Sequence, residues 1–332
     1  MTRHIIIALV LMLNMLVPLC LKAQTDAQFS QYYEVPSFYN PAAIGRTDFI
    51  RIRGGARMQW VGIDRAPKTF AAVADMPMKL FEKRIGLGVV VDQETAGLYS
   101  TLNFGAQFAY KFKKLGGTWT AGVQIGYIDQ GFKGSEVDIP DDDDYHEGND
   151  DALPRTDVHG GTVDFSAGIW YDHKMFYAGI SGTHLTAPTV KLKADGDNGG
   201  DATTGTERYF EFGARRTLYF MAGGNIPIKN TLFDILPSVL VKSDFAFTTA
   251  EINARVRYNR FLTFGVGYRW NDAVTATIAA EYKNFFIGYS YDYATSAIAR
   301  ASSGSHEVFA GYSLKLNLGN KNRNKHKSIR YM

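Results

Sequence analysis

The sequence predicts an all-β protein, a transmembrane antiparallel β-barrel of about 14 strands. Three observations predict it. Long segments alternate strictly between apolar and polar residues, many of them end in Tyr or Trp, and the connections between them alternate between long and short. Membrane-spanning strands have about ten residues, whereas strands of soluble proteins average five or six. A soluble all-β protein also alternates and remains the alternative fold.

Residues 1–23 are typical of a secretory signal peptide, with a positive start, an apolar core and Ala23 at the cleavage site. An N-terminal membrane anchor is the alternative, but the apolar run is short for a span and Pro18 lies near its end. Cys20, the only cysteine, lies in this segment. Cleavage leaves a mature chain without thiols, which excludes a disulfide scaffold and thiol catalysis.

Residues 24–45 are rich in aromatic residues and turn formers, and follow the period of neither a helix nor a strand. The aromatic residues are too apolar for a free tail, and Asn40-Pro41 favours a turn. Wall side chains alone need not fill a barrel of this width. We therefore expect a plug that enters the lumen from the periplasmic side, its tyrosine hydroxyls reaching the arginines of the first strand. A periplasmic docking segment is the alternative.

The predicted barrel covers residues 46–318, and alternation identifies its strands. In the strand over 99–112, Leu102, Phe104 and Phe108 share the apolar face. The predicted strands are 46–58, 67–77, 84–93, 99–112, 116–129, 162–172, 174–183, 216–227, 231–245, 248–258, 260–270, 273–282, 284–293 and 305–317.

The connections predict the topology. The longest, over 130–161 and 184–215, both follow odd-numbered strands, and so does 294–304, whereas the tight turns follow even-numbered strands. Outer-membrane barrels have long extracellular loops and short periplasmic turns. We therefore expect an integral outer-membrane barrel with both termini in the periplasm, including a basic tail over 319–332.

Charged residues fix which face of each strand points inward. Arg51, Arg53 and Arg57 share one parity, opposite Ile50 and Ile52. An arginine on the lipid face costs about 2–4 kcal/mol at mid-bilayer, so this parity must face the lumen. The residues expected to bind within the N-terminal segment and the lumen are Phe29, Tyr32, Tyr33, Asn40, Pro41, Arg51, Arg53, Arg57, Arg255 and Arg257.

Few features of the sequence indicate catalysis or the binding of nucleic acid or metal. The net charge of +3 gives no indication of nucleic-acid binding. The acidic loop around 136–151 favours a solvated extracellular loop, with a weak calcium site as the alternative. His184, like the other histidines beside predicted outer connections, is interpreted as a surface residue, and no hydrolase or phosphate-loop motif is present. We predict no catalytic residue, metal or cofactor.

Several motifs resemble the PorP/SprF family of outer-membrane proteins of the type IX secretion system. They span nearly all of the mature chain and are QFSQYY at 28–33, NPAAIG at 40–45, PKTFAAVADMP at 67–77, GLGVVVDQETAG at 86–97, LPSVLVK at 236–242, GYSYD at 288–292 and GSHEVFAGYSL at 304–314. One departure from the usual barrel pattern is that the chain continues past its last strand into the basic tail.

The resemblance implies a non-enzymatic accessory barrel that supports export or surface attachment of cargo such as gliding adhesins. It implies as partners the secretion ring components, a peptidoglycan-binding lipoprotein, the C-terminal domain of secreted cargo and outer-membrane lipid. A FadL-like transporter of hydrophobic small molecules and a general porin remain alternatives. A transporter needs an apolar pocket, whereas this lumen is predicted to be charged.

Overall fold

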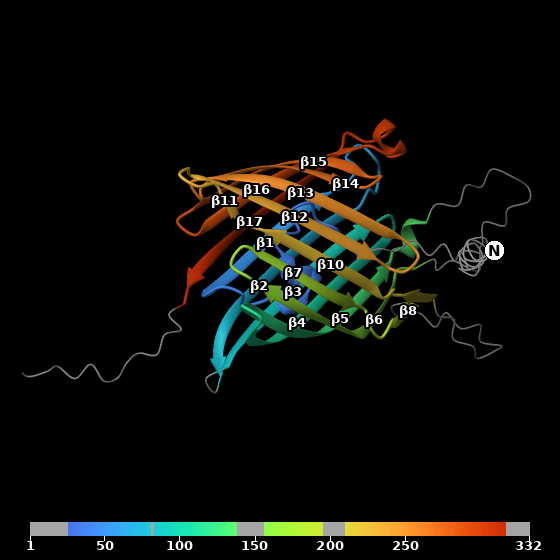
Figure 1. The fold of residues 1–332 in the computed structure, drawn as a ribbon. Coiled ribbons are helices and arrows are strands. Elements are labelled where there is room, and N and C mark those ends of the chain that lie inside the picture. The colour runs from blue at the N-terminus through green and yellow to red at the C-terminus, as the bar shows by residue number, and fades with distance from the viewer. Residues whose placement is uncertain (1–25, 81–82, 138–155, 195–209, 317–332) are drawn as a thin grey trace, which may run out of the picture.

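The chain forms a closed antiparallel barrel in a computed structural model that describes residues 26–80, 83–137, 156–194 and 210–316 (Figure 1). Within these residues, 17 strands hydrogen-bond to one another. Three of them, β8, β9 and β11, are additions at the rim, and the other 14 form a ring that closes because β1 pairs with both β2 and β17. The predicted fold class and strand number are confirmed.

The barrel strands and their additions follow the chain in order. They are β1 Phe49–Met58, β2 Lys68–Leu80, β3 Lys83–Ala96, β4 Tyr99–Lys114, β5 Gly117–Phe132, β6 Val158–Asp172, β7 Phe176–Thr183, β8 Thr189–Ala194, β9 Phe210–Gly213, β10 Thr217–Gly224, β11 Ile226–Pro227, β12 Phe233–Ser243, β13 Thr248–Tyr258, β14 Leu262–Arg269, β15 Ala273–Tyr282, β16 Phe285–Ala294 and β17 Ser305–Lys315. The short helices are α2 Pro36–Tyr39, η1 Pro41–Ala43, η2 Gly134–Glu136 and η3 Ala297–Arg300. No helix among the described residues is long and apolar enough to cross a membrane.

Each predicted strand corresponds to one barrel strand, except that the prediction for 216–227 joins β10 and the two-residue β11. The hairpin of β8 and β9 was not predicted and lies inside the expected connection over 184–215. Val190 and Leu192 of β8 pack on Ile128 and Val158 of the wall, which explains why so short a pair of strands is held in place.

The outer face of the barrel is apolar. Leu102, Phe104 and Phe108 of β4 are 42%, 50% and 43% exposed, whereas Arg53 and Arg57 of β1 are buried on the inner face. An apolar surface that surrounds a closed sheet suits lipid, because no strand edge is left with unpaired backbone groups. The inward and outward parities therefore agree with those read from the sequence.

The two ends of the barrel differ. One end carries tight turns, at 115–116, 259–261 and 283–284, and is called the short-turn end below. Both residues of the turns at 115–116 and 283–284 have positive φ, the geometry of the two-residue turns that match strand twist. The other end carries the connections 59–67 and 295–304 together with short turns at 97–98 and 270–272, and is called the long-connection end.

Some predicted features lie outside the described residues. These are the signal peptide, most of the acidic loop and the basic tail. The two termini, which we expected in the periplasm, also lie outside the described residues. The first described residue, Asp26, lies at the long-connection end next to Thr183, and β17 finishes at the short-turn end.

Candidate functional site in the barrel lumen

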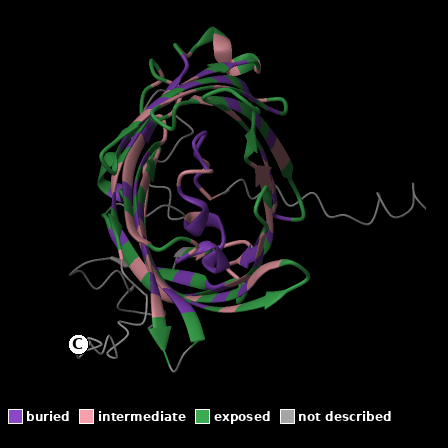
Figure 2. Cartoon of the chain, turned by 60° about the vertical axis from the view of Figure 1, so that its left-hand side comes forward, coloured by how far each residue is buried: buried purple, intermediate pink, exposed green. Residues whose placement is uncertain are grey.

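Residues 26–45, called the lumen segment below, lie in the interior of the barrel (Figure 2), and contacts at both ends show that they run from one end to the other. Thr183 at the long-connection end hydrogen-bonds to Asp26. At the short-turn end, Arg46 forms an ion pair of 2.6 Å with Asp172. The segment thus extends farther than the expected entry into one mouth of the barrel.

Aromatic side chains of the lumen segment form the core of the molecule. Phe29 and Tyr32 are fully buried and Tyr39 is 1% exposed. The Phe29 ring lies edge-on to Phe309 of β17, with 5.2 Å between ring centroids. The Tyr32 hydroxyl donates to Ser238 Oγ of β12 at 3.0 Å. Apolar burial is therefore one force that holds the segment inside, and it acts on several sides of the wall.

Asn40 fixes the middle of the lumen segment to two strands. Its Oδ1 accepts a hydrogen bond from the Ala42 backbone N–H at 2.9 Å, which caps η1, and Pro41 occupies the first position of that helix. Its Nδ2 donates to the backbone carbonyls of Ile169 on β6 and Ile180 on β7, each at 3.2 Å. The Asn-Pro pair is thus both a turn signal and an attachment point.

Glycines in the wall allow the backbone of the segment to approach closely. A Cβ atom on Gly122 of β5 would overlap the backbone of Pro41 and Ala42, and one on Gly168 of β6 would overlap the Asn40 side chain. The wall therefore lacks side chains where the segment touches it, which is a recognised role of glycine in strands.

Buried charges bind the lumen segment to four strands. Arg57 of β1 lies 2.7 Å from Asp292 of β16 and 3.2 Å from Glu307 of β17. The Ser30 backbone N–H donates to Glu307 at 2.8 Å, and its hydroxyl donates to Asp292. Arg269 of β14 completes the group by donating to the Ser30 hydroxyl at 2.8 Å. Because each charge faces an opposite charge or a hydrogen-bond partner, the group tolerates burial.

Arginines gather where the segment meets the short-turn end. The Glu34 carboxylate lies 3.8 Å from Arg53 and 3.9 Å from Arg255. The Arg255 guanidinium also covers the Tyr33 ring at 3.3 Å from its centroid. A cavity of about 560 Å³ opens beside these residues, and Arg257 also lines it. Its basic lining is suited to acidic groups of a partner.

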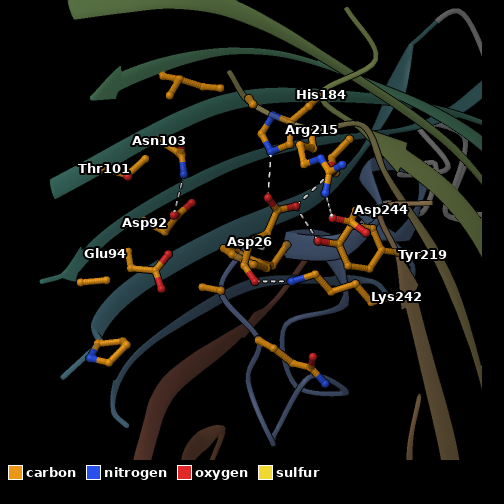
Figure 3. A pocket seen from close by; sticks show the side chains of 18 of the residues that line it. Asp26, Asp92, Glu94, Thr101, Asn103, His184, Arg215, Tyr219, Lys242 and Asp244 are labelled. Atoms are coloured by element: carbon orange, nitrogen blue, oxygen red, sulfur yellow. Dashed lines mark hydrogen bonds and ion pairs between the residues drawn. The ribbon is translucent and has the colours of Figure 1, made fainter. Parts of the chain in front are cut away.

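A second group of polar contacts holds the segment at the long-connection end (Figure 3). Asp26 Oδ1 lies 3.1 Å from His184 Nε2, Tyr219 donates to Asp26 Oδ2 at 2.6 Å, and Lys242 donates to the Asp26 carbonyl. Burial alone would lower the pKa of His184, but the carboxylates of Asp26 and Asp164 outweigh it and raise the pKa to about 10. His184, which follows β7, is therefore a cation at neutral pH.

All ten predicted site residues lie in the lumen segment or on the lumen face of the wall. Six of them fall into three groups: Arg53, Arg255 and Tyr33 near Glu34 at the short-turn end, Arg57 in the central charge group, and Asn40 with Pro41 at the attachment to β6 and β7. Phe29 and Tyr32 are core residues. Arg51 forms an ion pair with Asp75, which also accepts a hydrogen bond from the Gly45 backbone N–H of the lumen segment. Arg257 forms an ion pair with Asp234 of the wall.

Two expectations were wrong in detail. The arginines of the first strand are reached by Ser30 and Glu34 rather than by tyrosine hydroxyls. His184 is a largely enclosed ion-pair partner rather than a surface residue, because its side chain is 14% exposed and lies between two carboxylates. Sequence reasoning also missed Ser30, Glu307 and Asp26 as contact residues. Glu307 could have been found, since it shares the inward parity of its strand.

A closed antiparallel barrel with an apolar outer face and a charged, chain-filled lumen defines an integral outer-membrane β-barrel protein. The model of one family, described as the type IX secretion system membrane protein PorP/SprF, matches residues 21–312. The chain belongs to this family, as its motifs predicted. Its location is the outer membrane.

Other comparisons give distant likenesses. No curated protein matches the chain. A FadL homologue from Pseudomonas aeruginosa and the toluene transporter TodX from P. putida each have a TM-score of 0.46 and 10% sequence identity, covering 85% of this chain and 94% of theirs. The outer membrane protein Omp33 of Acinetobacter baumannii has a TM-score of 0.41 and 8% identity, with 81% of this chain and 98% of that chain covered.

Proposed function

We propose that this chain is a non-enzymatic component of the type IX secretion system that supports export or surface attachment of cargo, such as gliding adhesins, and is not a diffusion pore. The observation that carries the proposal is the lumen segment. A pore that passes solutes needs an open lumen, whereas here the interior is occupied by buried aromatic residues and an ionic group.

The charged side chains of the lumen do not suit a transporter of hydrophobic molecules. The larger cavity, at the long-connection end, has aromatic and aliphatic lining residues such as Phe104 and Trp270, but the carboxylates of Asp92, Glu94 and Asp164 also line it. Apolar ligands are bound in pockets with predominantly apolar linings, because burying unpaired charges beside them is costly. A charged barrel whose lumen is occupied by its own chain instead suits a membrane-anchored platform for other proteins.

The proposed partners follow from family membership and charge. They are the periplasmic ring components, a peptidoglycan-binding lipoprotein and the C-terminal domain of secreted cargo, with outer-membrane lipid around the barrel. The arginine-lined cavity at the short-turn end offers a surface for acidic groups, and we expect this end to face the periplasm.

Conductance tests whether the lumen is sealed. We expect the purified full chain to give no steady current in planar bilayers, and deletion of residues 28–45 to give open channels. The deletion also removes core contacts, so Arg57→Ala is a second variant, which should loosen the segment and raise the conductance. Arg84→Ala, whose ion pair is exposed, is its matched control and should conduct like the wild type. Steady wild-type channels that the deletion does not enlarge would contradict a sealed lumen.

The secretion role needs a separate test. The native protein, tagged and extracted in mild detergent, should co-purify with ring components or with a secreted protein that carries a C-terminal sorting domain. Cells that lack the gene should lose at least one such protein from their surface, and the wild-type gene should restore it. Unchanged surface proteins would exclude a cargo-specific role, whatever the conductance result.

A further inference from the structure

The cavity at the long-connection end contains acidic side chains that the lumen segment does not use. It has a volume of about 770 Å³, within the usual range for small-molecule sites of about 300–1,000 Å³. Asp92 and Glu94 line it from β3, two residues apart and on the same face of the strand. Figure 3 shows both apart from the basic residues that surround Asp26.

Neither of these two carboxylates has an ion-pair partner within 4 Å among the described residues. Asp92 is 6% exposed, and its carboxylate accepts a hydrogen bond from Asn103 Nδ2 at 2.9 Å. The basic side chains that line the cavity are engaged elsewhere: His184 with Asp26 and Asp164, Lys242 with the Asp26 carbonyl, Arg215 with Asp244, and Arg269 with Glu251 and Asp272.

A second observation concerns buried polar atoms in the same cavity. Asp164 and Ser166 of β6 are 4% and 2% exposed, and Asp164 Oδ1 and Ser166 Oγ have no hydrogen-bond partner within the described part of the chain. Asn103 Oδ1 is likewise without a partner there. Buried polar atoms normally have partners, so an unpaired set that lines one cavity points to a missing ligand.

The chemistry of the unpaired atoms defines the ligand. Carboxylate and amide oxygens only accept hydrogen bonds, so they need a donor, and a protonated amine supplies three donors and a positive charge. A bare metal ion is less suited, since no group of three or more metal-ligating side chains occurs among the described residues. Trp60, Tyr99 and Trp270 also line the cavity, and aromatic faces attract ammonium groups.

We propose that this cavity binds a small organic cation that carries more than one protonated amine, with Asp92 and Glu94 holding one ammonium group and Asn103, Asp164 and Ser166 offering acceptors to the others. The site lies on the long-connection side of the lumen segment, which we expect to face the cell exterior. It therefore serves an external ligand, and the inference does not depend on the secretion role.

Calorimetric titration of the full chain in detergent with spermidine tests this site. The folded wild-type protein should bind spermidine and not succinate. Asp92→Asn combined with Glu94→Gln should weaken binding tenfold or more, because bonds to charged groups are lost. The single variant Glu94→Gln, at a less buried position, should weaken it by a smaller factor. Glu281→Gln changes an acid of the opposite cavity and should leave binding unchanged.

Folding of each variant is checked by the shift in electrophoretic mobility that barrels show on heating. The proposal is overturned if folded wild-type protein does not bind spermidine, or if the double variant and Glu281→Gln bind it equally. It is also overturned if Ca²⁺ binds in an Asp92- and Glu94-dependent manner while spermidine does not, because the site would then be a metal site.

Discussion

Arg57 Nη2 lies 2.7 Å from Asp292 Oδ2, and each side chain is 2% exposed. These residues belong to β1 and β16, which are separated in the ring by β17, and both contact the Ser30 hydroxyl. One ion pair therefore joins the first strand to the closing strands and to the lumen segment. Barrel closure and retention of the segment depend on the same charges.

Arg57→Ala should destabilise the barrel strongly. Removal of one partner leaves Asp292 and Glu307 buried without their shared cation, which typically costs about 3–5 kcal/mol. Urea unfolding in detergent, followed by tryptophan fluorescence, measures the change. The control Arg84→Ala removes an exposed pair at the short-turn end and should cost less than about 1 kcal/mol. Equal costs for the two variants would show that the central group is not a stabilising element.

Gly122→Ala should disturb the lumen segment without touching a charge. The added methyl group would overlap the backbone of Pro41 and Ala42, which cannot move as a flexible side chain can. Overpacking of this kind costs about 1–3 kcal/mol. Unfolding midpoints measure it, and Gly213→Ala is the control, since its Cβ would meet nothing within 4 Å. A neutral Gly122→Ala would mean that the segment does not press on the wall there.

Asn40→Ala should loosen the middle of the segment. It loses the cap on η1 and both bonds to strand carbonyls, a cost of about 1–3 kcal/mol. Asn40→Asp keeps the cap but sets a charged oxygen against the carbonyls of Ile169 and Ile180, so it should be no better tolerated. Asn225→Ala, at an exposed position, is the control for both. Protease resistance of the segment is the readout, and equal resistance in all four proteins would argue against this attachment.

Stability should fall at high pH through His184. Its pKa is about 10 in the folded protein and about 6.5 in an unfolded chain, so the folded state binds the proton more tightly. The stabilising contribution is complete below about pH 6.5 and is lost as the pH rises through about 10. The free energy of unfolding should therefore drop less with pH in His184→Gln than in wild type. His173→Gln, at an exposed position, should follow the wild type, and parallel curves for all three would contradict the prediction.

Single cysteines should report the facing of the strands. In a Cys20→Ser background, a lipid-restricted thiol reagent should modify cysteines at positions 102, 104 and 108 and spare those at 51 and 53. The first three side chains are exposed on the outer wall, and Arg53 is buried inside. Gel shift or mass spectrometry measures the labelling. Modification of the arginine positions instead would mean that the register is inverted.

The sequence determined the facing of the wall residues. A strand alternates with a period of two, so a run such as 101–112 shows its outer face without reference to any neighbour. The same logic identified Arg53 and Arg57 as lumen residues, since arginine on the lipid face is too costly. The turn at Asn40-Pro41 was also readable, because the chemistry of both residues is local.

Only the tertiary structure decided which lumen residues meet. Ser30 and Glu307 are 277 residues apart, and their bond depends on the closing register of β1 against β17, in which Arg57 stands opposite Glu307. Local patterns carry no information on that register, because any shift by two residues preserves the same facing. The sequence alone also does not predict that the lumen segment reaches His184, because its path depends on the length and shape of the enclosed space.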